Sequence, residues 1–436
     1  MKDKKQNKRI NGGHRLLFFC ILCLFGLYVA VSYAEEQPQR EQSKTKVILL
    51  HTDNLTYDQY RHPGAQILTG NVQFQHDGVL MYCDSACFYE ATNSFDAFGH
   101  VKMVQGDTLD LVGDMLLYNG LDQLARVRHN VVLTHRESKL YTDSLDYDRL
   151  YELGYFFEGG KLVDKDNVLT SDWGQYSPPT RQAVFNYNVK LENPKFTLIS
   201  DTLNYNTLTS MAEIVGPSNI DSGDNHIYSE SGFYNTQTEE AILLDRSIVT
   251  NKGRKMVGDS LYYDSKSGVG EGFRNVVYTD EVNKNMLTGN YCYYNDSTGY
   301  SMATDSAVAI DYSQRDTMYM HADTFKVYTF YMDTDSMYRE VRGYHKVRSY
   351  RMDVQSVCDS LVFDSRDTCI TMYRDPIVWN GGQQVLGEVI KVYLNDSTID
   401  RIHVIDQTLS VERIDSVHYN QVAGKEMTSY FRDGEM

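Results

Sequence analysis

The most regular feature of the chain is a short alternation of apolar and polar residues. In SDTLNYN (200–206), Leu203 and Tyr205 lie two positions apart, and TDSLDYD (142–148) and GDSLYYD (258–264) show the same alternation. A period of two is typical of a β-strand with one apolar face. We therefore expect a strand at each of these segments, with its Leu and Tyr side chains pointing into a core.

These segments recur at a fixed interval. Their closing tyrosines follow one another at a constant step of 29 residues, and similar segments centred on Tyr57 and Tyr294 bring the number of copies to nine. A fixed step in this range is the signature of a repeat architecture. The tyrosines at the constant step are Tyr89, Tyr118, Tyr147, Tyr176, Tyr205, Tyr234 and Tyr263.

A second strand is predicted about midway between successive tyrosines. Each begins with a small or polar residue and then alternates: GNVQF (70–74), GHVKM (99–103), HNVVL (129–133), YNVKL (187–191) and RNVVY (274–278). Turn-forming residues separate the strands, which predicts turns at TNSFDAFGH (92–100), NTQTEE (235–240) and DSKSGVGEG (264–272). Each 29-residue unit is thus expected to hold two strands and two turns. No window in 47–300 has an apolar stripe of helical period.

A single hairpin with one apolar face is marginally stable in water, so successive hairpins are expected to stack. The predicted fold is all-β: an elongated β-jelly-roll or solenoid-like stack of two-strand hairpins. We expect the regular repeat to span 47–300 and a divergent continuation, with longer loops, to span 301–436. Such a stack ends in edge strands. The last residues, 420–436, carry no obvious polar cap, which favours docking by strand addition.

The N-terminal region is expected to direct export. Residues 1–34 hold six basic residues, an apolar run at 16–31 and small residues before Glu35, which predicts a secretory signal peptide. An uncleaved anchor is the alternative, although the apolar run is short for a spanning helix. Residues 35–46 are then a linker.

The net charge and the cysteine content limit the classes of function that the chain can have. Without residues 1–34 the chain carries 36 Lys and Arg against 58 Asp and Glu, a formal charge of −22, which disfavours nucleic acid as a partner. Five cysteines remain there, and their odd number and irregular spacing do not form a disulfide framework. Cys358 and Cys369 could still bridge across a hairpin, since export permits disulfides.

Familiar catalytic motifs are missing from the sequence. It contains no P-loop, no HExxH, no GxSxG and no pair of CxxC motifs, and its twelve histidines do not recur at ligand spacing. We therefore expect neither an enzyme nor a metal site, and no cofactor.

A row of carboxylates precedes the repeat tyrosines by four residues. One interpretation is a calcium-binding or catalytic row, but the short glycine-rich repeats of calcium-binding β-rolls are missing. We favour a structural role, in which each Asp begins a strand and bonds turn amides. The residues are Asp53, Asp114, Asp143, Asp172, Asp201 and Asp259, with Glu230 substituting once.

The recurrent [SGT]-D-x-L-x-Y strands alternating with G-N-V or G-H-V strands, behind a signal peptide, resemble the OstA/LptA family of lipopolysaccharide-transport proteins. The resemblance implies a periplasmic β-jelly-roll that shields the acyl chains of lipopolysaccharide on the way to the outer membrane. It also implies partners among other transport components, reached by edge-strand pairing, and end-to-end self-association. The family supplies no catalytic residue, and association with the inner or outer membrane is compatible with it.

By the same resemblance, the inward residues would line a lipid-binding groove. They are Val101, Met103, Val131, Leu133, Leu145, Tyr147, Val189, Leu191, Leu203, Tyr205, Leu261 and Tyr263.

Three alternatives stay open at this stage. Gly174 and Gly232 replace the Leu of neighbouring copies, so they leave space for an acyl chain beside Leu203 or else mark β-bulges. The apolar positions also suit a structural or adhesive exported solenoid. A β-helix enzyme acting on polysaccharide is the third alternative, although its rungs usually hold three shorter strands.

Overall fold

The computed structural model describes residues 45–282, 284–313, 316–332, 334–395 and 398–431. The predicted signal peptide (1–34) and most of the predicted linker lie outside these residues. In the described part, 32 strands join edge to edge in one antiparallel sheet, which confirms the all-β stack of consecutive hairpins. No helix in the described ranges has the length and apolar character needed to cross a membrane.

The strands and the single 3₁₀ turn follow one another along the chain. The first half comprises β1 (Ile48–His51), β2 (Asn54–Tyr57), β3 (Gln66–His76), β4 (Val79–Tyr89), η1 (Glu90–Thr92), β5 (Ser94–Gln105), β6 (Leu109–Asn119), β7 (Leu124–His135), β8 (Ser138–Asp148), β9 (Leu153–Phe156), β10 (Gly160–Asp164), β11 (Asn167–Ser171), β12 (Trp173–Ser177), β13 (Gln182–Asn193), β14 (Phe196–Asn206), β15 (Met211–Ser222) and β16 (Asn225–Asn235). The second half comprises β17 (Glu240–Leu244), β18 (Ile248–Asn251), β19 (Arg254–Val257), β20 (Ser260–Asp264), β21 (Val269–Asp280), β22 (Asn285–Asn295), β23 (Tyr300–Asp311), β24 (Met318–Phe330), β25 (Tyr338–Tyr350), β26 (Val354–Asp364), β27 (Cys369–Tyr373), β28 (Ile377–Asn380), β29 (Gln383–Leu386), β30 (Val389–Asn395), β31 (Thr398–Arg413) and β32 (Tyr419–Tyr430).

Most strands are longer than the sequence predicts because each is bent in its middle. The pairing of β3 with β4 shifts register between Thr69 and Val72, and that of β5 with β6 shifts between Phe98 and Val101. Elsewhere the bend divides one strand into two, as in β9 and β10. We call the strand halves that are joined by the β3–β4 turn, and by the equivalent turns of later rungs, arm A. The strand halves that are joined by the β4–β5 turn, and by the equivalent turns of later rungs, are arm B.

The bend is a two-residue bulge with positive φ angles. Gly99 (φ 77°) and His100 (φ 43°) form it in β5, and His129 and Asn130 form it in β7. This is the left-handed region, which Gly and Asn tolerate best. The segments GHVKM and HNVVL therefore contain the bend of a long strand rather than the start of a short one.

The predicted turn at 92–100 is correspondingly wrong in most of its length. The chain turns at Glu90–Thr92 and Asn93, and β5 already begins at Ser94. Gly99 gave this segment its turn-like composition, but the bulge needs that glycine for the same conformational reason that a turn would.

The two arms face each other across an apolar interior. The Phe74 ring of arm A stacks on Phe95 of arm B with centroids 4.1 Å apart, and Phe196 of arm A meets Tyr234 of arm B edge to face at 4.7 Å. The buried side chains form two clusters, one from Val47 to Leu261 and one from Val276 to Val404. The bulges lie at the apex of this V-shaped cross-section, and we call the opposite side, where the turns lie, the mouth.

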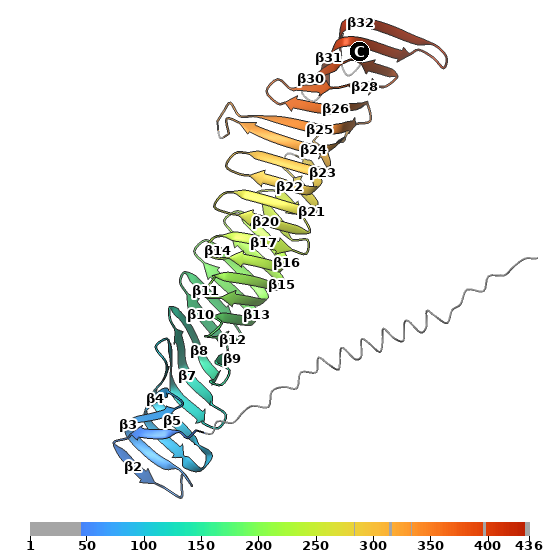
Figure 1. Cartoon of the computed structure of the whole chain (residues 1–436). Helices are drawn as coiled ribbons and strands as arrows, with labels where there is room; N and C mark the ends of the chain where they lie inside the picture. The colour runs from blue at the N-terminus through green and yellow to red at the C-terminus, as the bar shows by residue number, and fades with distance from the viewer. Residues whose placement is uncertain (1–44, 283, 314–315, 333, 396–397, 432–436) are drawn as a thin grey trace, which may run out of the picture.

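Stacked rungs make an elongated molecule with β2 near one end and β32 at the other (Figure 1). β32 pairs with β31 on one side, and nearly all its residues are exposed. Among the residues that the structure describes, the strand is therefore a free edge of the kind that the sequence predicts. The predicted boundary at residue 300, between the regular repeat and its divergent continuation, stays a prediction. Strands continue on both sides of it.

All five cysteines of the described residues are free thiols, so the suggested bridge between Cys358 and Cys369 does not form. Cys358 lies opposite Val347 and Cys369 opposite Asp364, so the pairing register separates them.

Candidate functional site

The inward residues predicted from the sequence lie inside the molecule. Eleven of the twelve are buried side chains that belong to a cluster of the core, with Leu203 and Tyr205 fully enclosed. Tyr263, near the end of that cluster, is partly exposed. Phe88 rather than Tyr89 faces the interior of the first rung, because it contacts Phe74 across the arms.

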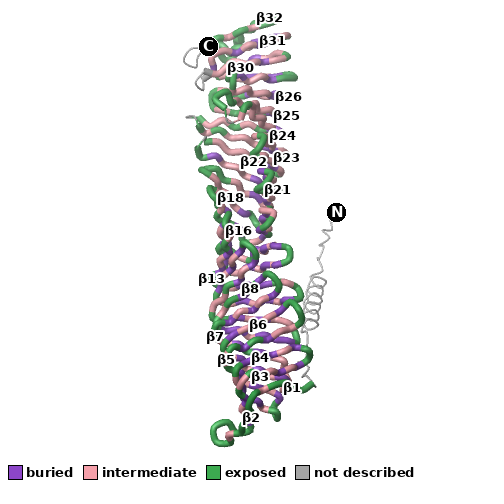
Figure 2. Tube along the Cα trace, turned by 90° about the vertical axis from the view of Figure 1, so that its left-hand side faces the viewer, coloured by how far each residue is buried: buried purple, intermediate pink, exposed green. Residues whose placement is uncertain are grey.

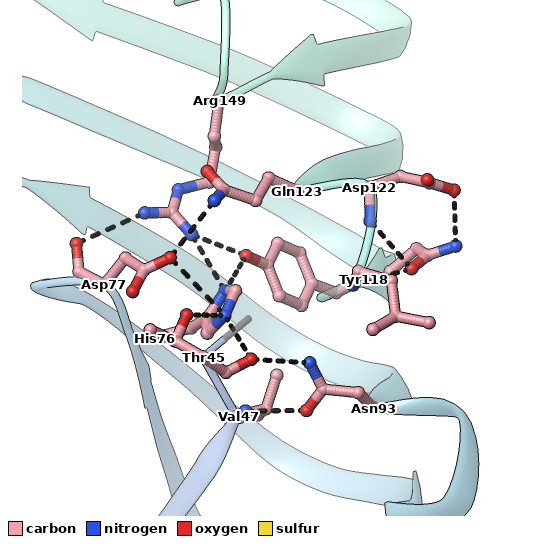
Figure 3. A network of polar contacts seen from close by, with 11 residues as sticks. Thr45, Val47, His76, Asp77, Asn93, Tyr118, Asp122, Gln123 and Arg149 are labelled. Carbon is pink, nitrogen blue, oxygen red and sulfur yellow. Dashed lines mark hydrogen bonds and ion pairs between the residues drawn. The ribbon is translucent and has the colours of Figure 1, made fainter. Parts of the chain in front are cut away.

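Polar bridges close the mouth over these first rungs. At the N-terminal end, His76 Nδ1 of arm A lies 2.7 Å from the Tyr118 hydroxyl of arm B, and Arg149 also donates to that hydroxyl (Figure 3). Arg149 Nη1 also lies 3.3 Å from His76 Nδ1. Because a guanidinium only donates, Nδ1 is an acceptor, and Tyr118 donates its own proton to it. The neutral imidazole then carries its proton on Nε2, which faces Thr45.

Further bridges repeat this arrangement along the chain. His135 Nδ1 lies 2.7 Å from the Tyr176 hydroxyl, and Tyr205 donates to Asp164 at 2.8 Å. Asn167 also donates to the Tyr205 hydroxyl at 2.9 Å. We call the part from β3 to β17 (residues 66–244), most of whose rungs these bridges cover, the closed segment.

The space predicted beside Leu203 is filled. A Cβ on Gly174 would lie 2.5 Å from the Phe156 ring, and one on Gly232 would lie 2.5 Å from the Ile242 carbonyl oxygen. Both glycines pair in register with their neighbours, so neither marks a bulge. Each is small because a neighbouring ring or backbone takes its volume, and neither leaves room for an acyl chain.

Beyond the closed segment the interior becomes accessible, although the strands continue. More of the chain is only partly buried from β19 to β31 (residues 254–413), which we call the open segment (Figure 2). Some of its inward side chains, such as Phe325 and Val347, stay fully buried, whereas others are partly exposed. Apolar side chains that are partly buried against the second core cluster are Met256, Leu287, Ala309, Met320, Val341, Val354, Phe363, Ile370 and Leu394. Their side chains form a partly exposed apolar lining.

A loss of side-chain volume accompanies this exposure. Two residues before each bulge, the closed segment places Leu68, Ala97, Val127, Phe156, Phe185, Ile214 and Leu243, whereas the next three rungs place Gly272, Ala303 and Gly343. Four residues after the bulge, Met103, Leu133 and Leu191 give way to Ala309 and Ser349 in β23 and β25. Neighbouring side chains take up part of this volume, since a Cβ on Gly272 would lie 2.9 Å from Val276 and one on Gly343 would lie 3.1 Å from the Phe325 ring.

The carboxylate row lies on the outside, at the apex. Asp114 accepts a hydrogen bond from Asn130 at 2.7 Å, Asp172 from Asn188 at 2.6 Å, and Asp259 from Asn275 at 2.8 Å. Asp172 and Asp259 directly precede β12 and β20, as we expected, whereas Asp114 lies within β6. Their donors are bulge side chains of a neighbouring strand and not the turn amides that we expected.

Asp201 likewise lies inside β14, opposite the bulge at Gly216. The described residues contain no group of three or more His, Cys, Asp or Glu side chains placed to hold a metal ion.

The comparison with known proteins agrees with this architecture. A family model described as OstA-like protein matches residues 44–201 and 196–259. The chain belongs to the OstA-like family. This confirms the resemblance found in the sequence and assigns the protein to a transport-associated periplasmic family that is not enzymatic. None of the curated proteins compared with the chain matches it.

In this OstA-like protein, the family match ends at residue 259, close to where the interior opens. Sequence reasoning from the Leu and Tyr positions concentrates on the closed segment and misses the open one. The signal that could have revealed it is the small size of Gly272, Ala303, Ala307 and Ala309 relative to most residues at matching positions of the repeat.

Proposed function

We propose that this OstA-like protein binds lipopolysaccharide through its acyl chains and carries it through the periplasm. The observation that carries the proposal is the apolar lining of the open segment, where inward residues become smaller and partly exposed. Removing apolar surface from water is favourable by about 25 cal/mol per Å². A protein that leaves such a lining accessible therefore gains stability when an apolar chain covers it.

The twelve inward residues predicted from the sequence remain candidate lipid contacts. Tyr263 is the one among them that solvent already reaches. The other eleven would become contacts only if the arms separated, because their side chains are packed against one another in the closed segment.

Partners and location follow from the family and from the free edges. Other lipopolysaccharide-transport components would pair with the exposed backbone of β32, or of β2 at the other end. A signal peptide at 1–34 would deliver the chain to the periplasm, where either membrane is within reach of its partners. The chain supplies an apolar path and no catalysis, so the energy for moving lipid must come from another protein.

Filling the open interior tests the proposal. Ala309 faces inward on β23 and is partly exposed, whereas the adjacent Val308 faces outward. We expect Ala309→Phe to weaken binding of purified lipopolysaccharide roughly tenfold, equivalent to about 1.4 kcal/mol, measured by titration calorimetry on the full chain. Val308→Phe is the matched control and should bind as the unmodified chain does.

Equal binding by both variants and the unmodified protein would contradict the assignment of the site. A complete lack of lipopolysaccharide binding by the unmodified protein would instead favour the structural solenoid.

A further inference from the structure

We infer that the lipid path of this protein is one-ended: acyl chains occupy the interior of the open segment and do not pass into the closed segment. The inference rests on the proposed function and limits it to one half of the molecule. It differs from a through-conduit, in which lipid would travel the whole length of the interior.

The closed segment is already filled with its own side chains. Phe74 and Phe95 stack at 4.1 Å across the arms, and the largest fully buried side chains include Tyr118, Tyr147 and Phe185. Protein interiors pack as densely as organic crystals, so a chain of methylene groups could enter only by displacing such residues.

The mouth of the closed segment is also tied shut. The His76–Tyr118, His135–Tyr176 and Asp164–Tyr205 contacts join arm A to arm B over successive rungs. An amphiphile keeps its polar headgroup in water, so it must enter a groove sideways through an open mouth. Parting the arms would break these buried hydrogen bonds without replacing them.

The boundary between the two segments is narrow. Leu243 and Leu261 are the last large pair of the first cluster, and Gly270 and Gly272 follow on the next strand. A Cβ added to Gly270 would have no neighbour closer than 3.8 Å, the Tyr263 ring. A Cβ on Gly272 would lie 2.9 Å from Val276, so the added space at this boundary is confined to the surroundings of Gly270.

The chemistry of the open segment fits an acyl chain. Among the described residues, its inward lining consists mainly of Met, Ala, Val, Leu, Ile, Phe and Tyr side chains, with the Arg254–Asp280 ion pair at its first rung. Ten strands from β20 to β31 contribute to arm B here, which gives a length of about 45 Å at the usual strand spacing of about 4.8 Å. Chains can lie along this length while their headgroups project through the mouth.

A one-ended path has a mechanical consequence. The same half of the molecule must receive lipid and release it, so both the donor and the acceptor have to reach the open segment. The closed segment, about 60 Å long at the same spacing, then acts as a stiff spacer that sets the distance of the binding half from whatever holds its N-terminal end.

Photo-crosslinking of the full chain with purified lipopolysaccharide tests this inference. A benzoylphenylalanine replaces one inward aromatic residue at a time, at Tyr294 or Phe363 in the open segment and at Tyr147 or Tyr205 in the closed segment. All four are aromatic and inward, so each pair controls for the size and the orientation of the probe. We expect capture of lipopolysaccharide at Tyr294 and Phe363 only.

Capture at all four positions would overturn the one-ended path and leave the proposed function standing. Capture at none would overturn the proposed function, and with it this inference. Since a bulky probe at Tyr205 can disturb folding, hydrogen exchange of the unmodified chain gives a second measurement. Added lipopolysaccharide should slow amide exchange within 254–413 and leave 66–244 unchanged, whereas slowing over both ranges would contradict confinement.

Discussion

The inward tyrosines are chemically identical but differ in what their hydroxyl groups contact. The Tyr205 hydroxyl donates to Asp164 and accepts from Asn167. The Tyr147 hydroxyl is buried with no hydrogen-bond partner. Burial raises the pKa of both phenols, and the Asp164 carboxylate raises that of Tyr205 further, so both hydroxyls keep their protons. Only one of them stabilises the fold through a hydrogen bond.

This difference predicts opposite effects of the same substitution. Tyr205→Phe should lower the free energy of unfolding by about 1–3 kcal/mol, because it leaves the buried Asp164 carboxylate short of a donor. Tyr147→Phe should leave stability unchanged or raise it slightly, since it removes an unpaired buried group. The urea midpoint of each full-length variant measures the effect, and equal losses in the two variants would refute the assignment.

At the residue scale, the sequence predicts inward positions well and their environments poorly. The alternation in SDTLNYN correctly places Leu203 and Tyr205 inside. Nothing in that pattern distinguishes Tyr205 from Tyr147, because the partner Asp164 comes from another rung, 41 residues away. The filling of the space at Gly174 by Phe156 is likewise a contact between strands, which alternation along one strand does not encode.

At the scale of the strand, the bend decides how the interior closes. A straight strand would give a flat sheet with one solvated face, whereas the bulge folds each strand so that its two halves face each other. Pairs such as Gly-His at 99–100 look like strand starts or turns in the sequence, because the same residues suit all three structures. The sequence therefore yields the number of strands per repeat but not the V-shaped cross-section.

The bridges between arm ends predict acid sensitivity of the closed segment. Burial lowers the pKa of His76 and His135 below the ordinary 6.5; Arg149 lowers that of His76 further, while Asp77 and the Thr45 carbonyl oppose the shift. Arg136 and Arg181 lower the pKa of His135 further. The unfolded chain thus binds more protons than the folded one below pH 6.5, so the stability contributed by the neutral histidines is present above pH 6.5 and lost as pH falls.

Melting temperatures at pH 7.5 and pH 5.5 measure this loss. The unmodified chain should melt lower at pH 5.5, and a His76→Gln, His135→Gln double variant should show a smaller drop. His100→Gln is the control, because Asp84 raises the pKa of the exposed His100, which makes its contribution opposite in sign. An undiminished drop in the double variant would show that other groups cause the acid sensitivity.

At the scale of the whole molecule, the free edge at β32 predicts head-to-tail association. An edge strand that pairs with a different surface of the next copy gives open chains rather than closed dimers. Light scattering should therefore show a mass that grows with concentration. Val422→Lys on β32 should reduce this growth, since lysine on an edge strand opposes pairing.

Val417→Lys is the matched control, because Val417 is also exposed but lies in the turn before β32. A constant monomer mass at all concentrations, or equal effects of the two lysines, would contradict association through β32.

The apex pairs give the molecule an adjustable length. Each repeat carries its own bulge and, in most rungs, its own carboxylate partner, as in Asp114 with Asn130 and Asp172 with Asn188. Each rung therefore contains the residues that form and stabilise its bend, and it needs from its neighbours only a strand edge with which to pair. Gain or loss of one 29-residue unit during evolution would change the reach by about 10 Å, two strand spacings, without redesign of the cross-section. The length of the protein can thus be matched to the width of a compartment in steps of one repeat.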